Sequence, residues 1–432
     1  MVLLRGAGRG RHQVHLTVLI LATTTGYQIR SFGEAAEALG VRLLFGSDRC
    51  DQLDDPWWDG AIPIRFHEPR RSADAIASAA GARDLRGVIA VGDRPTLIAA
   101  LVAERLRLPG NPPAAAMASR NKVTTRHALR QAGLRTPAFL SIPKTADIER
   151  LAPRIAFPSV VKPLALSGSR GVVRVDNAAE LRAAVERLNA ILEAPDVRAE
   201  RDAAHDMIVI ESFIPGREYA VEGLLTDGRF RPLAIFDKPD PLDGPFFEET
   251  IYVTPSRASD ATQAHIIDAI ARAADALGLR HGPVHAECRV NDEGVWVLEV
   301  AARPIGGLCS KALRFAGPPC ISLEELLLRH AIGEDVSAFA REAEASAVMM
   351  IPIPRRGLYR GVDGLDAARA VPGVDDIRIT AKPEAVVVPL PEGRSYLGFI
   401  FAHACDAADA ERAVREAHVR LHFQIDRELP VI

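Results

Sequence analysis

Two strand-like runs joined by a short polar segment could form a β-hairpin that brings two glutamates close together. The runs cover residues 285–290 and 295–300. We expect a loop of three residues between them, Asp292–Gly294, with its glycine in the left-handed conformation, so that Asn291 pairs with Val295. A loop of two or four residues would instead put the two glutamates on opposite faces of the hairpin.

Counting outward from that loop, Glu287 lies directly opposite Glu299 on one face. Opposed residues have Cβ atoms roughly 5 Å apart, and two like charges at that distance destabilise a sheet. A divalent cation between the carboxylates removes the repulsion, and hard oxygen ligands favour Mg²⁺. The spacing therefore predicts a site for Mg²⁺, with Mn²⁺ as an alternative. Two exposed glutamates are the simpler interpretation of this hairpin alone.

Residues beside the hairpin extend this candidate site. Arg303 follows shortly after the second strand, and the flexible pair Gly306 and Gly307 comes next. A cation beyond a metal-binding strand suits a transferring phosphoryl group or a negatively charged intermediate. His285 shares the face of Glu287 if the strand alternates, so it could line the pocket or make a structural hydrogen bond.

A second segment could bind phosphate. Lys162 ends a strand-like run and precedes a small glycine-containing loop, residues 167–172. Backbone N–H groups of such a loop can lie along phosphates while the ammonium neutralises them, although an ordinary turn has the same composition. The candidate contacts in the loop are Ser167, Gly168, Ser169 and Gly171.

A third segment could hold a flat heterocycle. A buried strand over residues 207–210 leads into a polar hinge and a turn, and a second strand begins with Glu218. Such a hinge can offer backbone groups to a purine edge and a carboxylate to ribose hydroxyls, although an ordinary strand–turn–strand connection also fits. The candidate hinge residues are Glu211, Ser212, Phe213 and Ile214.

Composition limits the classes of protein that can carry these segments. The chain has 432 residues, enough for two to four packed units, with 48% hydrophobic and 25% charged residues. Its formal net charge of −3 argues against nucleic acid as the main partner. The five cysteines stand singly, without zinc spacing, as expected of free thiols in a reducing cytoplasm. No apolar run is long enough to cross a membrane, and residues 1–15 resemble a loose tail more than a secretory signal. These features predict a cytoplasmic protein.

The elements that must position the candidate residues follow from hydrophobic periodicity. Strand-like runs and helical patterns alternate up to about residue 115, which predicts an open parallel sheet. A dinucleotide-binding fingerprint is absent, because the only glycine cluster, residues 6–10, precedes the first strand. A Pro-rich stretch at 108–113 marks a boundary, and residues 114–132 form one helical pattern. A long helix is expected over 259–277, and residues 345–432 predict a small α+β unit.

In this order, the segments resemble the ATP-grasp superfamily. Asn121-Lys122, at the start of a helix, is similar to that family's first ATP lysine, and Lys162 to the second. The loop 167–172 resembles its mobile phosphate cover, and residues 211–214 its adenine hinge, with Glu218 as a nucleotide contact. Glu287 and Glu299 resemble the two metal-binding glutamates, and Arg303 the family arginine. The resemblance therefore implies ATP and Mg²⁺ as cofactors.

The resemblance also implies a domain organisation that covers nearly the whole chain. An N-terminal α/β domain takes residues 1–115, including the loose tail 1–15. A central ATP-grasp domain takes residues 116–335 and includes a mobile lid at about 140–212. A small α+β domain takes residues 336–432.

One position departs from the family pattern. The run Glu299–Arg303 contains Ala301 where the family has an asparagine that binds metal, so this position supplies no ligand. The second metal would then depend on a bidentate Glu299, phosphate oxygens and water. We expect an active site, because the glutamates, the lysines and the arginine are all present.

Within the superfamily, the L-amino acid ligase branch is the most similar. The string from Glu299 to Gly307 resembles those ligases, as does the C-terminal unit with its segments 361–365, 389–391 and 395–399. The alternatives are an enzyme like glycinamide ribonucleotide synthetase, an enzyme like biotin carboxylase, and an ATP-binding module without turnover. No biotin-carrier segment is present in the sequence.

This resemblance implies an ADP-forming ligase that makes an amide or peptide bond through an acyl phosphate. Its partners are small carboxylate and amine substrates, one of them an L-amino acid, with no nucleic acid and no membrane. A homodimer is a possible assembly, because members of the family are often dimers. Glu249 is the candidate for holding a substrate ammonium, with Tyr252 beside it, although a solvated acidic loop would have the same composition.

Overall fold

The N-terminal part is an open parallel sheet covered by helices. The computed structural model describes residues 16–23, 28–48, 61–80, 84–317 and 319–427. The strands run in the order β3-β2-β1-β4 with every pairing parallel, as predicted from the alternating pattern. The predicted tail, the glycine cluster at 6–10 and Cys50 lie outside the described residues. The elements are β1 (Thr17–Ala22), α1 (Ile29–Leu39), β2 (Arg42–Ser47), β3 (Ala61–Pro63), α2 (Pro69–Ala80), β4 (Leu85–Val91) and α3 (Thr96–Leu106).

The helical pattern over 114–132 is two helices, and the second begins at Lys122, as the resemblance implied. Helix α4 (Pro113–Arg120) ends at Asn121, whose backbone is extended with φ −103° and ψ 108°. The Asn121 side chain then caps α5 (Lys122–Gln131) by accepting a hydrogen bond from the backbone N–H of Thr124. This break places Lys122 at the first residue of a helix.

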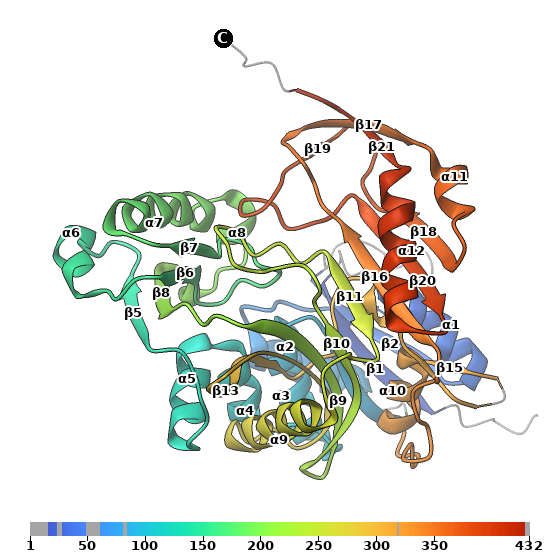
Figure 1. Cartoon of the computed structure of the whole chain (residues 1–432). Helices are drawn as coiled ribbons and strands as arrows, with labels where there is room; N and C mark the ends of the chain where they lie inside the picture. Colours follow the sequence, from blue (N-terminus) through green and yellow to red (C-terminus); the bar gives the residue numbers. More distant parts are fainter. Residues whose placement is uncertain (1–15, 24–27, 49–60, 81–83, 318, 428–432) are drawn as a thin grey trace, which may run out of the picture.

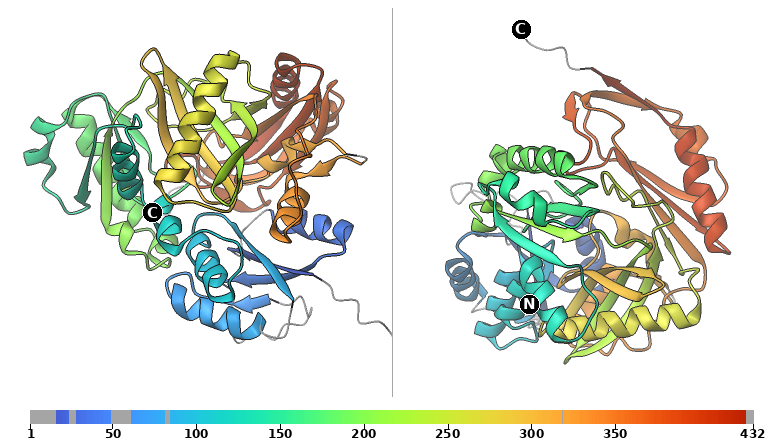
Figure 2. Two further views of the ribbon diagram at one scale, coloured as in Figure 1. Left: turned by 90° about the horizontal axis from the view of Figure 1, so that it is seen from below. Right: turned by 60° about the vertical axis from the view of Figure 1, so that its left-hand side comes forward.

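A second sheet forms a lobe that projects from the rest of the molecule (Figures 1 and 2). Its strand order is β5-β8-β6-β7, all antiparallel. Helix α7 covers it and buries an apolar stripe that includes Leu181, Val185, Leu188 and Leu192. The elements of this lobe are β5 (Phe139–Pro143), α6 (Ile148–Leu151), the 3₁₀ helix Ala152–Arg154, β6 (Ser159–Pro163), β7 (Val173–Val175), α7 (Ala178–Leu192), α8 (Pro195–Arg198), the 3₁₀ helix Ala203–Asp206 and β8 (Met207–Ser212).

The centre of the molecule is one antiparallel sheet of eight strands in the order β13-β12-β9-β10-β11-β16-β20-β18. Its central strands are β9 (Arg217–Thr226), β10 (Arg229–Asp237), β11 (Ile251–Thr254), β12 (Gly282–Asn291) and β13 (Gly294–Ala301), with α9 (Asp260–Ala276) following β11 in the chain. The connection from this sheet to the C-terminal region contains the 3₁₀ helix Cys309–Ala312, β14 (Arg314–Phe315), β15 (Ile321–Ser322) and α10 (Leu323–Ala331).

The C-terminal region continues this sheet, which the prediction of a small separate unit did not anticipate. Strand β16 pairs with β11 from Ile251↔Met349 to Thr254↔Ser346, and this pairing fuses the two regions. A further sheet of order β19-β17-β21 includes β17, which was missed in the sequence because it begins with glycine and carries few apolar residues. The elements are β16 (Ala345–Ile351), β17 (Gly357–Asp363), α11 (Leu365–Arg369), β18 (Val374–Ile379), β19 (Ala385–Val387), β20 (Gly398–Ala404), α12 (Ala407–Val419) and β21 (His422–Asp426).

The largest hydrophobic core joins all three regions. It contains Val18 of β1 and Phe32 of α1 from the N-terminal region, Phe236 of β10, and Val348 and Phe401 from the C-terminal strands, each 3% exposed or less. Among the described residues, four cysteines are free thiols, and no helix is both long and apolar enough for a membrane span. The shared core explains why these regions hold a fixed arrangement around the site.

Candidate active site

Strands β12 and β13 form a hairpin, called the glutamate hairpin here, that pairs Glu287 with Glu299 as predicted. The turn between the two strands differs from the predicted one. The loop is a two-residue turn, Asp292 and Glu293, because Asn291 pairs with Gly294. The prediction of a three-residue loop was therefore wrong, and a regular two-residue hairpin would separate the glutamates. A β-bulge then shifts the register by one residue, and Glu287 does face Glu299. The bulge restores the arrangement that the loop alone would have lost.

The two opposed carboxylates have different cationic neighbours. Glu287 accepts a hydrogen bond from Lys238 Nζ at 3.1 Å, and its Oε1 lies 3.6 Å from His285 Nε2. Glu299 Oε1 lies 3.9 Å from Arg303 Nη2. Although burial alone raises the pKa of Glu287, the charges of Lys238 and His285 hold that pKa well below its ordinary value. Glu287 therefore stays ionised, as a metal ligand must be.

Arg303 is fixed by a carboxylate from the N-terminal domain. Its Nε and Nη2 donate to the two oxygens of Asp93 at 3.0 and 3.4 Å. Asp93 follows β4, at the carboxyl end of a parallel strand, where open α/β sheets place their binding residues. Burial raises the pKa of Asp93, but the charge of Arg303 outweighs it and the pKa is lowered. The pair orients the guanidinium toward the hairpin.

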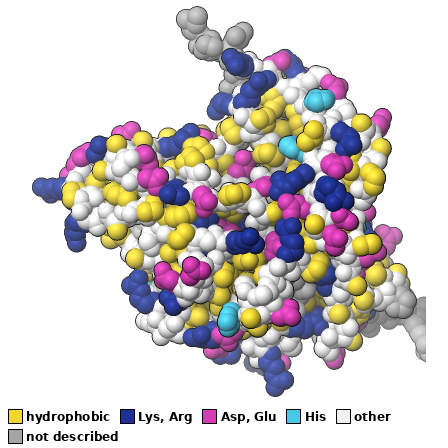
Figure 3. All heavy atoms as spheres, in the orientation of Figure 1, with side chains coloured by type: hydrophobic (Ala, Val, Ile, Leu, Met, Phe, Trp, Pro, Cys, Tyr) yellow, Lys and Arg dark blue, Asp and Glu magenta, His cyan; other side chains and the backbone are white. Residues whose placement is uncertain are grey.

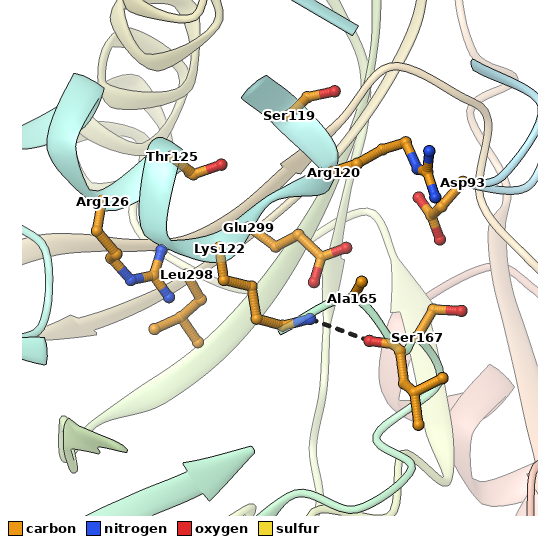
Figure 4. Close-up of a pocket in the computed structure, with 11 residues that line it drawn as sticks. Asp93, Ser119, Arg120, Lys122, Thr125, Arg126, Ala165, Ser167, Leu298 and Glu299 are labelled. Carbon is orange, nitrogen blue, oxygen red and sulfur yellow. Dashed lines mark hydrogen bonds between the residues drawn. The ribbon is translucent and has the colours of Figure 1, made fainter. Parts of the chain in front are cut away.

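A pocket lies where these elements meet (Figure 4). In Figure 4, Glu299 from β13 points into the space between Lys122 and Arg120, with Asp93 on the far side. Lys122 Nζ donates to the carbonyl oxygen of Leu166, in the loop after β6, at 3.0 Å. The pocket is lined by Asp93, Ser119, Arg120, Lys122, Thr125, Arg126, Ala165, Leu166, Ser167, Leu298 and Glu299.

Lys162 belongs to a buried group of three charges beside this pocket. Its Nζ lies 2.5 Å from Glu211 Oε2, and Arg126 donates to both oxygens of Glu211 at 2.8 and 3.1 Å. Burial lowers the pKa of Lys162 to about 8 in spite of Glu211. The charges of Arg126 and Lys162 lower the pKa of Glu211 to about 2, although burial acts in the opposite direction. Two cations share one carboxylate, so the group carries an excess positive charge that suits a phosphate.

The predicted adenine hinge is only partly available to a ligand. The carboxylate of Glu211 is turned inward toward Arg126 and Lys162, and only 3% of the residue is exposed. The backbone N–H of Ser212 donates to Ala138 and that of Phe213 to Pro158. These two N–H groups are therefore already used within the protein, and a purine at the hinge would have to bind other backbone groups. Ile214 is buried beside them, and its carbonyl accepts a hydrogen bond from Arg289.

The predicted phosphate loop turns sharply and touches the C-terminal region. Gly168, Ser169 and Gly171 all have positive φ, of 65°, 54° and 74°. The backbone N–H of Gly171 donates to Pro391 at 2.9 Å, and Arg170 Nε donates to the carbonyl of Glu392 at 3.0 Å. The structure therefore holds the loop against residues 389–394, more than 200 positions later in the chain.

Lys238 lies at the centre of an acidic group that includes Glu287 of the hairpin. Its Nζ donates to Glu218 at 2.8 Å, to Glu249 at 2.5 Å and to Glu287 at 3.1 Å. These carboxylates raise the pKa of Lys238 well above its ordinary value, although its burial lowers it. Burial raises the pKa of Glu249 to about 7, and Tyr252 donates to the second oxygen of Glu249 at 2.9 Å. Glu249 and Tyr252 thus lie together, with an internal ammonium already between the glutamates.

Glu218 is also tied to Arg289, which donates to its Oε2 at 2.8 Å. The predicted nucleotide contact therefore bridges Lys238 and Arg289 inside the protein. His285 faces the same side as Glu287, as the alternation predicted, and its Nδ1 lies 2.5 Å from Glu222 Oε1. Burial lowers the pKa of His285, but the charge of Glu222 outweighs it and raises the pKa to about 9.

Gly306 and Gly307 lie in the segment after Arg303. The backbone of Gly307 has φ 63°, and a Cβ there would come within 3.2 Å of the Phe399 ring. Phe399 is a C-terminal residue on β20, so this glycine permits close approach of two regions.

Charged residues gather between the projecting lobe and the C-terminal region in the middle of the face shown in Figure 3. Sequence reasoning missed three charged residues that complete the site: Asp93, Arg120 and Arg126. Their partners are distant in sequence, and the position of Asp93 after a parallel strand was the one local signal.

Comparisons with known proteins agree with this geometry. The ATP-grasp N-terminal domain matches residues 33–110, the ATP-grasp domain residues 155–312, and L-amino acid ligase C-terminal domain 2 residues 349–426. The chain is similar to carnosine synthase 1 of Gallus gallus, with 29% identity over 340 residues, which are 74% of this chain and 36% of that protein. It is 27% identical to alanine–anticapsin ligase of Bacillus subtilis over 263 residues, which are 56% of this chain and 51% of that protein.

The chain thus spans about a third and about half of the length of these two relatives. Among solved structures, the L-amino acid ligase from Bacillus licheniformis is similar over its whole length, with a TM-score of 0.81, 28% identity and 96% of this chain covered. The chain therefore has the domains of an ATP-grasp protein, and it is similar to the L-amino acid ligases in its C-terminal domain and its fold.

Proposed function

We propose that this ATP-grasp ligase couples the carboxylate of one small molecule to the amine of another, with an L-amino acid as one of the two substrates. The enzyme class is that of ADP-forming carboxylate–amine ligases. The observation that carries the proposal is that Lys122 and Glu299 line one pocket. Arg303 lies 3.9 Å from Glu299, and Lys162 shares the carboxylate of Glu211 with Arg126, which also lines the pocket.

The residues around the pocket fit Mg²⁺ and the phosphates of ATP. Lys122 and Lys162, with Arg126 behind, give an excess of positive charge at one end. Glu287 and Glu299 offer opposed carboxylate oxygens, which are the ligands that Mg²⁺ prefers. When bound there, the ion supplies charge neutralisation for the phosphates.

The reaction then has two steps. An oxygen of the substrate carboxylate attacks the γ-phosphorus of ATP and forms a new P–O bond. The bond between the γ-phosphorus and its bridging oxygen breaks, and ADP leaves with that oxygen. The amine next attacks the carbonyl carbon of the acyl phosphate, and phosphate leaves as the amide forms and the nitrogen loses its proton. Arg303, held by Asp93, faces the negative charge of both steps, where fixed donors are most effective. The loop 167–172 excludes water, which would otherwise hydrolyse the acyl phosphate.

The amine substrate fits the acidic end of the site. Glu249 and Tyr252 lie within hydrogen-bond distance of each other beside Glu287 and are the proposed contacts for an ammonium group. Lys238 donates to the other oxygen of Glu249. A substrate ammonium would share the carboxylate of Glu249 with Lys238.

A screen for ADP release over pairs of amino acids, with mass spectrometry of the products, tests the proposal. We expect ADP and an amide in equal amounts for at least one pair. ATP turnover that depends on bicarbonate and ignores amines would contradict it, as would the absence of turnover with every pair.

A further inference from the structure

Position 301 leaves a gap in the ligand set of the glutamate hairpin. Ala301 lies two residues after Glu299 on β13, so both side chains point to one face, and a methyl group offers no donor atom. The register places His285 of β12 directly opposite Ala301, just as Glu287 is opposite Glu299. The four residues therefore form two neighbouring cross-strand pairs, and an imidazole borders the space that the alanine leaves.

The imidazole has the surroundings of a metal ligand. Its Nε2 is 3.6 Å from Glu287 Oε1, whereas two neighbouring ligand atoms on one ion are about 3 Å apart, so a small shift brings both to one metal. Its other nitrogen, Nδ1, is 2.5 Å from Glu222 Oε1. A carboxylate on the far nitrogen is the usual partner of a ligating histidine, because it fixes the ring and its tautomer. Glu222 and His285 are 1% and 5% exposed, so this arrangement is built into the core.

We propose that Nε2 of His285 is a ligand of the metal held by Glu287 and Glu299, and that it supplies the donor that Ala301 lacks. The inference rests on the proposed function, because it assumes that a metal occupies the glutamate pair. Metal binding displaces the proton from Nε2, as for any imidazole ligand.

The choice of metal follows from this ligand. Mg²⁺ prefers oxygen ligands, whereas an imidazole nitrogen is a better ligand for transition metals. With one nitrogen in the set, the site favours Mn²⁺ over Mg²⁺ more strongly than a site made of oxygens alone.

Pulsed EPR on the full-length protein tests the ligand directly. The protein is labelled with ¹⁵N-histidine and loaded with Mn²⁺ and unlabelled ADP, so that imidazole gives ¹⁵N modulation and adenine gives ¹⁴N. We expect ¹⁵N modulation in the same complex that shows ³¹P coupling to ADP, and its loss in His285→Gln. The amide of that variant can still donate to Glu222, and circular dichroism checks its fold.

A rescue variant separates ligand loss from general damage. We expect His285→Gln to weaken Mn²⁺ binding by at least about tenfold. The double variant His285→Gln/Ala301→Asn should regain affinity and shift the preference toward Mg²⁺, because the asparagine supplies an oxygen ligand. An Mn²⁺–ADP complex without ¹⁵N modulation in the wild type would overturn this inference alone. Absence of any Mn²⁺–ADP complex would overturn the metal assignment as well. The ADP-release screen tests the proposed function independently of the inference about His285.

Discussion

Glu299 belongs both to the proposed metal site and to the pocket proposed for the phosphates. It lines the pocket that contains Lys122, faces Glu287 across the hairpin and lies near Arg303. Because a single carboxylate connects these partners, its removal tests them together.

We expect Glu299→Ala to lower kcat/KM for ATP turnover on the order of 100-fold or more, with the fold retained. The side chain is 32% exposed, so its loss leaves no large cavity. Glu293→Ala, in the exposed turn of the same hairpin, is the matched control and should keep normal activity. The measurement is steady-state ADP release with circular dichroism. Near-normal turnover in Glu299→Ala would contradict the metal assignment.

Lys162 gives the site a pH dependence. Its pKa is lowered to about 8, so the ammonium is present below pH 8 and is lost as the pH rises through that value, whereas an ordinary lysine keeps its charge up to about pH 10. We expect KM for ATP to rise between pH 7.5 and 9.5 as the phosphate contact weakens. The readout is the pH profile of KM.

Lys162→Arg is the control for this profile, because a guanidinium does not titrate in that range. Its KM for ATP should change much less with pH than that of the wild type. An identical profile in both proteins would show that another group titrates.

At the scale of elements, the position of the lobe depends on its contact with the C-terminal loop 389–394. Arg170 makes an ion pair with Asp196 at 2.7 Å and a hydrogen bond to the Glu392 carbonyl at 3.0 Å, and Arg187 pairs with Glu392. These contacts hold the loop 167–172 beside the pocket, so under the proposed function they should govern how well water is excluded.

We expect Arg170→Ala to raise the ratio of ADP to amide product severalfold, because an acyl phosphate under a loose cover is hydrolysed before the amine attacks. The ratio is measured by coupled ADP detection and mass spectrometry. Arg182→Ala, which removes an exposed ion pair with Glu149 in the same lobe, should keep the wild-type ratio. An unchanged ratio in Arg170→Ala would mean that the loop closes without this contact.

The sequence predicted the helices and strands better than the turns, bulges and long-range contacts that connect them. Alternating runs predicted the parallel sheet, and the spacing of Glu287 and Glu299 predicted their pairing. The pairing was right only because a bulge compensated for a shorter loop, and a bulge has no reliable signature in one sequence. Asp93 and Arg126 were missed as site residues because their partners, Arg303 and Glu211, lie far away in the chain and are brought together only by the fold.

At the scale of the whole molecule, the three regions share one core, and the central and C-terminal regions also share one sheet. Strand β16 extends the central sheet, and Phe401 packs in the same cluster as Val18 and Phe236. Domains linked only by flexible segments would unfold separately, whereas these regions should unfold together.

We therefore expect Phe401→Ala to lower the stability of the whole core by about 3–5 kcal/mol. Differential scanning calorimetry should show the main transition shifting as one peak to a lower temperature. Val419→Ala, at a residue that is 76% exposed at the end of α12, should leave the transition in place. A separate early peak for the C-terminal region alone would contradict the shared core.

The central claim is that ATP activates a carboxylate as an acyl phosphate within this site. The most direct measurement uses a substrate pair from the ADP-release screen, with the carboxylate oxygens labelled with ¹⁸O. Attack of the carboxylate on the γ-phosphorus predicts one ¹⁸O atom in each phosphate released per amide formed. Amide formation with unlabelled phosphate would contradict the account.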